Sequence, residues 1–238
     1  MQDARLDLSR RQRLGIVEAV WGQHKDSAQI IDILQTLTDA GELSLVTRVS
    51  PEKAAAVQAV LPDVVHHRDA RCLTLGALPQ QPAQGTEVAV LSGGSSDRCV
   101  VAEASLALQC HGIGAERVMD VGVAGLHRLL DQLPRLRSFR VLIVCAGMEG
   151  ALPTVLGGLV PQPVIAVPVS VGYGISEGGR TALEGMLSSC APGVVVVNID
   201  NGYGAAMAAI RMLRGMGASD QILDSDQNNL RPNHQLRG

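Results

Sequence analysis

The chain has 238 residues, of which 46% are hydrophobic and 18% are charged, a composition typical of a globular protein with a substantial core. A formal net charge of -3, with only one Trp, two Tyr and one Phe, argues against the basic, aromatic surface that nucleic-acid binding requires. Five cysteines without a CxxC spacing argue against a disulfide framework or a zinc site, and the first residues show no signal-peptide pattern, so we expect a cytoplasmic protein.

Residues 1–80 are predicted to form a small α/β domain. Apolar residues recur at helical spacing over 26–40, and Ser50 followed by Pro51 is typical of the start of a second helix. Three short apolar runs predict strands, at 44–49, 64–67 and 72–75. The polar stretch 78–85 contains prolines and is the best candidate for a linker to the rest of the chain.

Residues 86–217 are predicted to form a larger domain around a parallel sheet, followed by a polar tail at 218–238. Short apolar runs that end in glycine-containing turns are typical of strands buried on both faces, and they lie at 88–94, 117–122, 141–147, 164–172 and 194–202. Helical patterns follow them, at 97–110, 126–133, 149–159, 178–189 and 204–214. This alternation predicts right-handed crossovers and a doubly wound, flavodoxin-like three-layer sandwich.

The stretch 150–176 carries no charge and is long enough to span a bilayer. It nevertheless contains several prolines and divides into a helix pattern and a strand pattern. We therefore interpret it as buried core and expect no membrane contact.

The glycine turns predict one binding site, because open parallel sheets bind ligands at the carboxyl ends of their strands. In the first turn, Ser95, Ser96 and Asp97 stand where a strand is followed by a helix. The amides of a helix N-terminus suit an anion such as a phosphate. Asp97 would accept sugar hydroxyls there, or it would simply cap the helix.

The second and third turns contribute charged candidates. Arg128 could make a forked contact with a phosphate or carboxylate. His127 beside it could shuttle protons near neutral pH, or it could be a structural residue. Glu149 is the only carboxylate in a long uncharged region, which suggests a buried functional group. The alternative is that Glu149 caps the helix that begins at Gly150.

Cys190 precedes the fifth predicted strand in a turn of small residues. Most single cysteines act as small hydrophobic residues, although this turn suggests the accessibility that a reactive thiolate needs. The turn lies at the amino-terminal end of the predicted sheet, opposite the glycine turns.

A family resemblance rests on five motifs of the larger domain: DVGVAGLHR (120–128), AGMEGALP (146–153), VPVSVGYG (167–174), SCAPG (189–193) and VNIDNGYG (197–204). With them the chain resembles the LarB family, the carboxylase/hydrolases of nickel-pincer nucleotide biosynthesis, which are related to the aminoimidazole ribonucleotide carboxylases. The resemblance covers most of 86–215 and extends into the small domain through RLGIVEAVWG (13–22) and LVTR (45–48).

The resemblance implies that nicotinic acid adenine dinucleotide, CO2 and water give pyridinium-3,5-biscarboxylate mononucleotide and AMP. It implies that Cys190 adds to C4 of the pyridinium ring and that Glu149 removes the C5 proton, with His127 as a third catalytic residue. The implied substrate-binding residues are Ser95, Ser96, Asp97, Arg128, Gly147, Met148, Gly172 and Gly174. CO2 or bicarbonate would be a substrate, no cofactor or metal would be tightly bound, and a requirement for Mg2+ stays open.

Two alternatives stay open. An aminoimidazole ribonucleotide carboxylase would use the same fold and nucleotide loops, but its substrate is already an enamine and needs no thiolate. A non-catalytic nucleotide-binding module would bind nucleotide without carboxylating it or releasing AMP.

The topology also predicts an assembly. Cys190 and Glu149 are expected at opposite ends of the strands, separated by a strand length of roughly 17–20 Å. Covalent catalysis needs reacting atoms within about 3.5 Å. We therefore expect Cys190 to enter the pocket from a neighbouring subunit of an obligate homo-oligomer, and the resemblance to the purine carboxylases implies an octamer with shared active sites.

Overall fold

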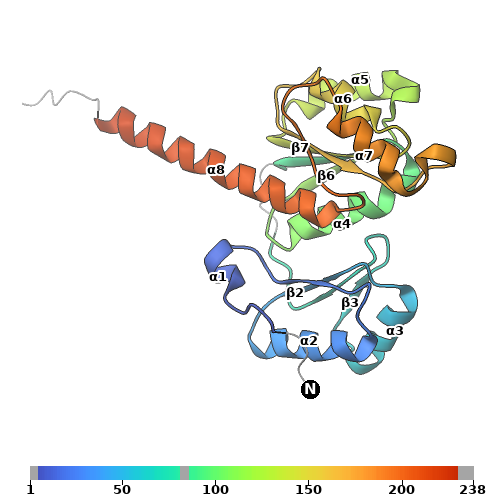
Figure 1. Ribbon diagram of the computed structural model, residues 1–238. Helices are drawn as coiled ribbons and strands as arrows, with labels where there is room; N and C mark the ends of the chain where they lie inside the picture. Colours follow the sequence, from blue (N-terminus) through green and yellow to red (C-terminus); the bar gives the residue numbers. More distant parts are fainter. Residues whose placement is uncertain (1–4, 81–85, 230–238) are drawn as a thin grey trace, which may run out of the picture.

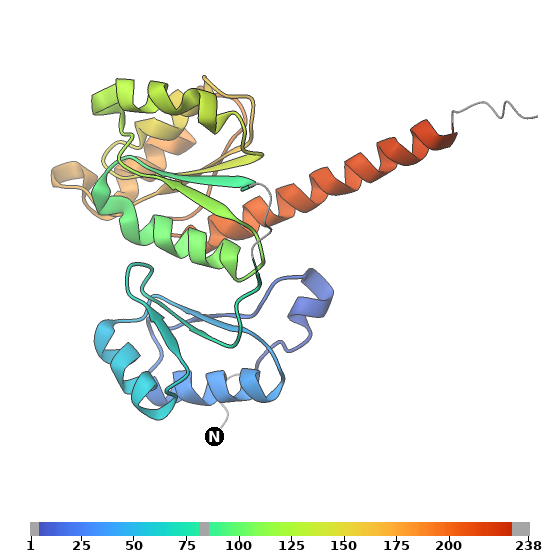
Figure 2. The same ribbon diagram turned by 180° about the vertical axis from the view of Figure 1, so that it is seen from behind.

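The computed structural model describes residues 5–80 and 86–229, which form two β-sheets with helices between and outside them (Figures 1 and 2). The predicted linker, 78–85, and the predicted tail, 218–238, lie partly outside the described residues. Among the residues described, no helix has both the length and the apolar character needed to cross a membrane.

The N-terminal sheet has four strands in the order β1-β2-β4-β3. They are β1 (Ala19–Trp21), β2 (Ser44–Thr47), β3 (Val65–His67) and β4 (Cys72–Leu75). β1 and β2 are parallel, whereas β4 runs antiparallel to both of its neighbours. The sequence predicts three of these strands. It does not predict β1, because a run of three residues is too short to show a strand periodicity.

Three helices accompany this sheet: α1 (Arg10–Leu14), α2 (Ser27–Asp39) and α3 (Pro51–Val60). The carboxylate of Asp26 accepts a hydrogen bond from the backbone N–H of Gln29, whose side chain accepts one from Asp26 in return. This capping box starts α2, and the hydroxyl of Ser50 caps α3. The two predicted helices therefore begin where the sequence signals place them.

The larger sheet has five parallel strands in the order β6-β5-β7-β8-β9. They are β5 (Val88–Ser92), β6 (Ala115–Val118), β7 (Val141–Ala146), β8 (Val164–Pro168) and β9 (Val194–Val196). This order is that of a flavodoxin-like doubly wound sheet, and it confirms the predicted fold class. β6 ends earlier than the predicted run 117–122, so 119–122 belong to the turn that follows it.

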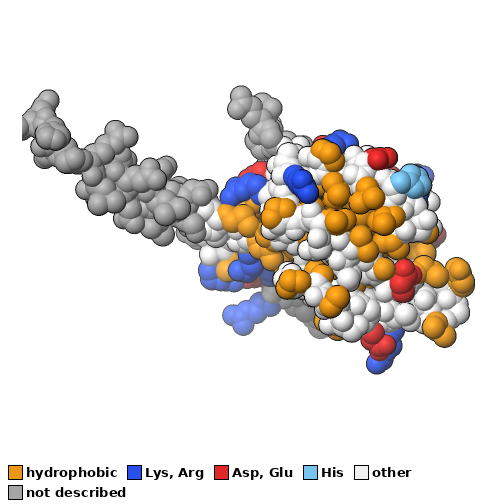
Figure 3. Space-filling model, turned by 90° about the horizontal axis from the view of Figure 1, so that it is seen from above, with side chains coloured by type: hydrophobic (Ala, Val, Ile, Leu, Met, Phe, Trp, Pro, Cys, Tyr) orange, Lys and Arg blue, Asp and Glu red, His pale blue; other side chains and the backbone are white. Residues whose placement is uncertain are grey.

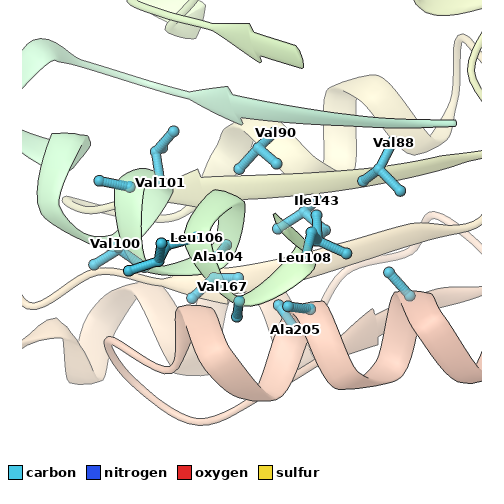
Figure 4. Packing of buried hydrophobic residues seen from close by; sticks show 14 of the residues in the cluster. Val88, Val90, Val100, Val101, Ala104, Leu106, Leu108, Ile143, Val167 and Ala205 are labelled. Atoms are coloured by element: carbon cyan, nitrogen blue, oxygen red, sulfur yellow. The ribbon is translucent and has the colours of Figure 1, made fainter. Parts of the chain in front are cut away.

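Five helices cover the two faces of this sheet: α4 (Arg98–Gln109), α5 (Leu126–Leu136), α6 (Ala151–Gly157), α7 (Arg180–Leu187) and α8 (Gly202–Asn229). α4 and α8 pack on one face, where Val90 and Ile143 of the strands lie against Val101 and Ala205 of the helices (Figure 4). α5, α6 and α7 cover the other face. Three short 3-10 helices lie in the turns: η1 (Ser95–Asp97), η2 (Val123–Gly125) and η3 (Gly174–Gly179).

α8 is much longer than the predicted helix 204–214 and projects from the body of the protein (Figure 1). Residues 218–229, which are predicted to form a polar tail, are helical. The prediction of a tail is wrong for these residues: the segment is polar, but it contains no glycine or proline that would end a helix.

The two sheets share the layer formed by α4 and α8. Leu45 of β2 and Cys72 of β4 belong to the same apolar cluster as Val101 of α4 and Ala209 of α8. The other face of the N-terminal sheet packs on α2 and α3, so β2 is buried on both sides. The small domain is therefore joined to the back of the larger sheet through a continuous core.

Candidate active site

Turns at the carboxyl-terminal end of the five-stranded sheet enclose a pocket of about 440 Å³. They follow β5, β6, β7 and β8. The pocket opens where β5 and β7 lie side by side, which is the point where the crossovers diverge to opposite faces of the sheet. Its position agrees with the site that the glycine turns predict, and its size is that of a small-molecule site.

The pocket brings together most of the predicted site residues. Seven line it: Ser96, Asp97, Arg128, Gly147, Met148, Glu149 and Gly172. Four others, all within the described part of the chain, lie outside its lining: Ser95, His127, Gly174 and Cys190.

Two glycines allow the turns to approach each other closely. A Cβ atom at Gly122 would overlap the carbonyl oxygen of Gly93, and one at Gly147 would overlap that of Val171. Because glycine alone lacks a Cβ, the turn after β5 can contact the backbone of the turn after β6, and the turn after β7 can contact that of the turn after β8. Much of the pocket wall is therefore backbone, which leaves amide and carbonyl groups within reach of a ligand.

Asp97 organises the turn after β5. Its side chain is buried, with 4% of the residue exposed, and one carboxylate oxygen accepts a hydrogen bond from the N–H of Gly94 at 2.8 Å. Burial raises the pKa of this carboxyl, and hydrogen bonds from Gly94 and Gly93 oppose that rise. Asp97 thus closes its own turn and also lines the pocket, so the structure is compatible with both predicted roles.

An ion pair positions Arg128 at the pocket. The guanidinium lies 2.6 Å from a carboxylate oxygen of Asp120, and the arginine side chain is 39% exposed. Asp120 has a left-handed φ of 59°, and its N–H donates to the buried hydroxyl of Ser92 at 2.9 Å. These contacts fix a cation at the pocket, where it can meet an anionic group of a ligand.

Glu149 lies at the pocket but is exposed, so the prediction of a buried carboxylate is wrong. The apolar stretch around it is core, yet Glu149 itself stands in the tight turn after β7, where the chain reaches the surface. Met148 before it has a left-handed φ of 53°. α6 begins at Ala151 with Gly150 as its N-cap and has no side-chain cap hydrogen bond, so Glu149 does not cap this helix.

His127 is exposed in the first turn of α5, outside the pocket lining. Ser95 and Gly174 are also exposed and also lie outside that lining. Ser95 stands between Gly94 and Ser96, which both line the pocket, so it lies at the pocket's edge.

Cys190 lies at the opposite end of the sheet, in the turn between α7 and β9. The hydroxyl of Ser189 next to it accepts a hydrogen bond from the hydroxyl of Thr154 at 2.7 Å, which anchors this turn to α6. All five cysteines belong to the described residues, and Cys190 is the exposed one. Burial raises the pKa of the Cys110 thiol to about 12 and also raises that of Cys145, so those thiols are poor nucleophiles.

Several pocket residues carry no chemical signal in the sequence. Tyr173 lines the pocket and is 77% exposed, Val123 contributes apolar surface, and the buried Leu152 lies behind the wall. Their one indication in the sequence is their position in or beside the glycine turns, as with Tyr173 directly after Gly172.

Two family models match the chain. One, described as a LarB/PurE-like N-terminal domain, matches residues 1–77, and the other, described as AIR carboxylase, matches residues 87–233. "Uncharacterized protein MJ0165" of Methanocaldococcus jannaschii is 37% identical over 212 residues, which are 86% of this chain and 82% of that protein. A crystal structure of Treponema denticola PurE is 20% identical with a TM-score of 0.45, over 61% of this chain and 98% of that one.

The family models follow one another along the chain, and the archaeal relative matches across both of them. Three of the five motifs of the larger domain lie in the turns around the pocket, one lies in the Cys190 turn, and VNIDNGYG (197–204) lies between β9 and α8 and at the start of α8. The chain therefore belongs to the LarB family, within the carboxylase superfamily that includes the AIR carboxylases.

Proposed function

We propose that this protein carboxylates the pyridinium ring of nicotinic acid adenine dinucleotide at C5 and hydrolyses its phosphoanhydride bond. The dinucleotide, CO2 and water would give pyridinium-3,5-biscarboxylate mononucleotide and AMP. The observation that carries the proposal is the exposure of Cys190, because a thiol nucleophile is needed for a pyridinium substrate and is superfluous for one that is already an enamine.

The chemistry gives Cys190 and Glu149 distinct tasks. A pyridinium ring is electron-poor, so its C5 cannot attack CO2 until electrons are added. Addition of the Cys190 thiolate to C4 makes an enamine, whose C5 forms a bond to the carbon of CO2. Glu149 then accepts the proton from C5, the electrons of that C–H bond restore the aromatic ring, and the C4–S bond breaks to release the thiolate.

The pocket supports the binding step of this proposal. Backbone amides in the turn after β5 precede α4, and Arg128 is held nearby by Asp120. Both features suit the phosphate groups of a nucleotide. Tyr173 and Val123 add aromatic and apolar surface against which a ring can pack.

We further propose that the active site is shared between subunits. Glu149 and Cys190 lie at opposite ends of the sheet in one chain, and the thiol is not part of the pocket lining. Because covalent attack needs atoms within about 3.5 Å, a second copy must supply the thiol.

The outer face of α5, η3 and α7 offers a surface for that second copy. Exposed apolar side chains on these elements include Leu126, Leu130, Ile175 and Leu187. Figure 3 shows hydrophobic side chains gathered on the outer face of the larger domain. Apolar surface of this kind favours contact between subunits, and the family resemblance favours an octamer.

The second candidate function is the carboxylation of aminoimidazole ribonucleotide. It is favoured by the AIR carboxylase model, which covers the whole of the pocket-bearing domain. Its substrate needs no thiolate, so Cys190→Ser should leave this activity intact and abolish the pyridinium reaction.

Incubation of the purified protein with the dinucleotide and labelled bicarbonate, followed by mass spectrometry, tests the proposal. We expect AMP and a mononucleotide carrying one labelled carboxylate, in equal amounts. A parallel incubation replaces the dinucleotide with aminoimidazole ribonucleotide, and turnover of that compound alone would overturn the proposal. Repeating the reaction with a chelator shows whether phosphoanhydride cleavage requires Mg2+.

A further inference from the structure

An arginine of the small domain reaches the active-site end of the larger domain. Arg48 directly follows β2 and has a left-handed φ of 56°. Its guanidinium donates to the carbonyl oxygen of Asp200 at 2.7 Å and to that of Ile199 at 3.4 Å. A non-glycine residue adopts this backbone conformation at a cost of about 1–2 kcal/mol, so the surrounding contacts hold Arg48 in place.

Asp200 links this contact to the pocket wall. Its carboxylate accepts a hydrogen bond from the N–H of Ser170 at 2.8 Å, and its own N–H donates to the carbonyl of Pro168 at 2.8 Å. Ser170 stands directly before Val171, Gly172 and Tyr173, which line the pocket.

The wall then meets the turn that carries Glu149. The carbonyl of Val171 accepts a hydrogen bond from the N–H of Met148 at 3.4 Å, and it is also the group that lies against Gly147. A continuous path of hydrogen bonds and chain therefore runs from Arg48 through Asp200 and Val171 to the residue before Glu149.

The charges at the junction of the domains also connect the small domain to the region behind the pocket. Glu103 of α4 is 5% exposed and accepts a hydrogen bond from the N–H of Tyr203 at 2.8 Å. Burial raises the pKa of Glu103, Arg48 and Arg71 of the small domain lower it, and Asp200 raises it. The small domain thus contributes the cations that face the carboxylates behind the pocket.

We propose that the small domain positions the active site, and that Arg48 is its positioning residue, acting through Asp200 on the pocket wall at 170–173. This role goes beyond the proposed reaction and would serve any ligand of the pocket. It also explains why the small domain is packed against α4 and α8, where it can reach the turn between β9 and α8.

A matched control exists at the same domain junction. Arg214 of α8 also joins the domains through two carbonyl acceptors, those of Leu14 at 2.7 Å and Gly15 at 2.9 Å. Leu14 and Gly15 lie at the end of α1, and neither they nor Arg214 line the pocket. Arg214→Gln therefore removes comparable interdomain hydrogen bonds without touching the path to the pocket wall.

Hydrogen exchange measured by mass spectrometry on the full-length protein tests the proposal without a substrate. We expect Arg48→Gln to speed exchange in peptides covering 168–176 by about tenfold, the effect of losing a charge-assisted hydrogen bond. Arg214→Gln should leave those peptides unchanged. If both variants speed exchange there equally, or neither does, Arg48 does not position the pocket wall.

Asp200→Ala provides a second route if Arg48→Gln does not fold. It removes the carboxylate that holds Ser170 but keeps the carbonyl that Arg48 contacts, so it should loosen 168–176 as well. Protection equal to wild type in Asp200→Ala would overturn the proposal.

In the carboxylation assay, Arg48→Gln should raise KM for the dinucleotide about tenfold, and Arg48→Lys, which can still donate, should restore part of it. An unchanged KM in Arg48→Gln would contradict the positioning role. If the wild type does not turn over the dinucleotide, the proposed reaction fails, while the exchange experiment still decides the role of Arg48.

Discussion

The two ends of the five-stranded sheet differ in what they offer a substrate. At the carboxyl-terminal end, glycine turns in backbone contact surround a pocket lined by two carboxylates, Asp97 and Glu149, and by Arg128, which is paired with Asp120. At the amino-terminal end, the turn with Cys190 offers an exposed thiol and is anchored to α6. In the proposed reaction the first end would bind the substrate and the second would supply the nucleophile, which requires that the ends of two subunits meet.

The largest effect on activity is expected from Cys190→Ser, which changes the amino-terminal end of the sheet. A hydroxyl is nearly the size of a thiol but is not ionised near neutral pH, so carboxylation of the dinucleotide should be lost. The melting temperature should stay at the wild-type value, because the side chain is exposed. Cys99→Ser is the matched control and should remain active. Near-wild-type turnover by Cys190→Ser would contradict the covalent mechanism.

Glu149→Gln probes the opposite end. The amide keeps the size of the side chain but removes the base, and general base catalysis typically contributes about 10²–10⁴-fold. We expect a loss of turnover in that range with little change in AMP affinity, measured by calorimetry. Glu177→Gln changes an exposed glutamate on η3 outside the pocket lining and should be neutral. A loss of only about twofold in Glu149→Gln would remove Glu149 from the mechanism.

Co-expression of the Cys190→Ser and Glu149→Gln subunits sharpens the comparison, because each variant is defective at one end only. In randomly mixed assemblies of symmetric subunits, about a quarter of shared sites would combine an intact thiol with an intact carboxylate. Activity should therefore recover to roughly that fraction of wild type. Mixed assemblies that are purified through two different tags and remain inactive would show that the site is not shared.

The sequence predicts the carboxyl-terminal end of the sheet better than its surroundings. Gly147 and Gly172 stand at the ends of apolar runs, and at both positions another backbone carbonyl lies too close for a Cβ atom. This requirement for glycine is local, so it can be recognised in a single sequence. Glu149 is misjudged as buried because burial depends on where a strand ends, and the strand end is not encoded by the apolar run alone.

Contacts between distant parts of the chain are the hardest feature to predict from the sequence. Arg48 and Asp200 are 152 residues apart, and nothing in either local sequence indicates that they meet. The shared core between the two sheets is equally invisible, since Leu45 and Val101 each read as ordinary buried residues of their own elements. Local pattern thus predicts the turns of the pocket, whereas packing determines what holds them.

Gly147→Ala tests whether close approach builds the pocket. Its Cβ would overlap the carbonyl of Val171, so the turns must separate, and we expect a loss of about 1–3 kcal/mol of unfolding free energy together with weaker nucleotide binding. Gly158→Ala is the control, because Gly158 is exposed with a φ of -85° and its added Cβ would make only ordinary van der Waals contacts, 3.6 Å or more from the nearest atoms. Denaturant unfolding should show no loss there, and equal destabilisation by both substitutions would contradict the role of close approach.

The smallest expected effect concerns Glu103, behind the pocket at the domain junction. Burial raises its pKa in the folded protein, which means that the folded state favours the protonated carboxyl. Stability from this group is therefore greatest below its ordinary pKa and is lost as pH rises through the raised one. Glu103→Gln keeps an acceptor for the N–H of Tyr203 and carries no charge at any pH.

The melting temperature of Glu103→Gln should accordingly exceed that of wild type at about pH 8, and the two should converge as pH falls to about 4. We expect a difference of no more than about 4 °C, because about 1 kcal/mol shifts the melting temperature of a protein of this size by roughly 2–4 °C. A difference that does not change with pH would mean that Arg48 and Arg71 already compensate the buried charge. The junction would then be an electrostatic match between the domains, and the penalty of burying Glu103 would not limit the stability of the pocket end.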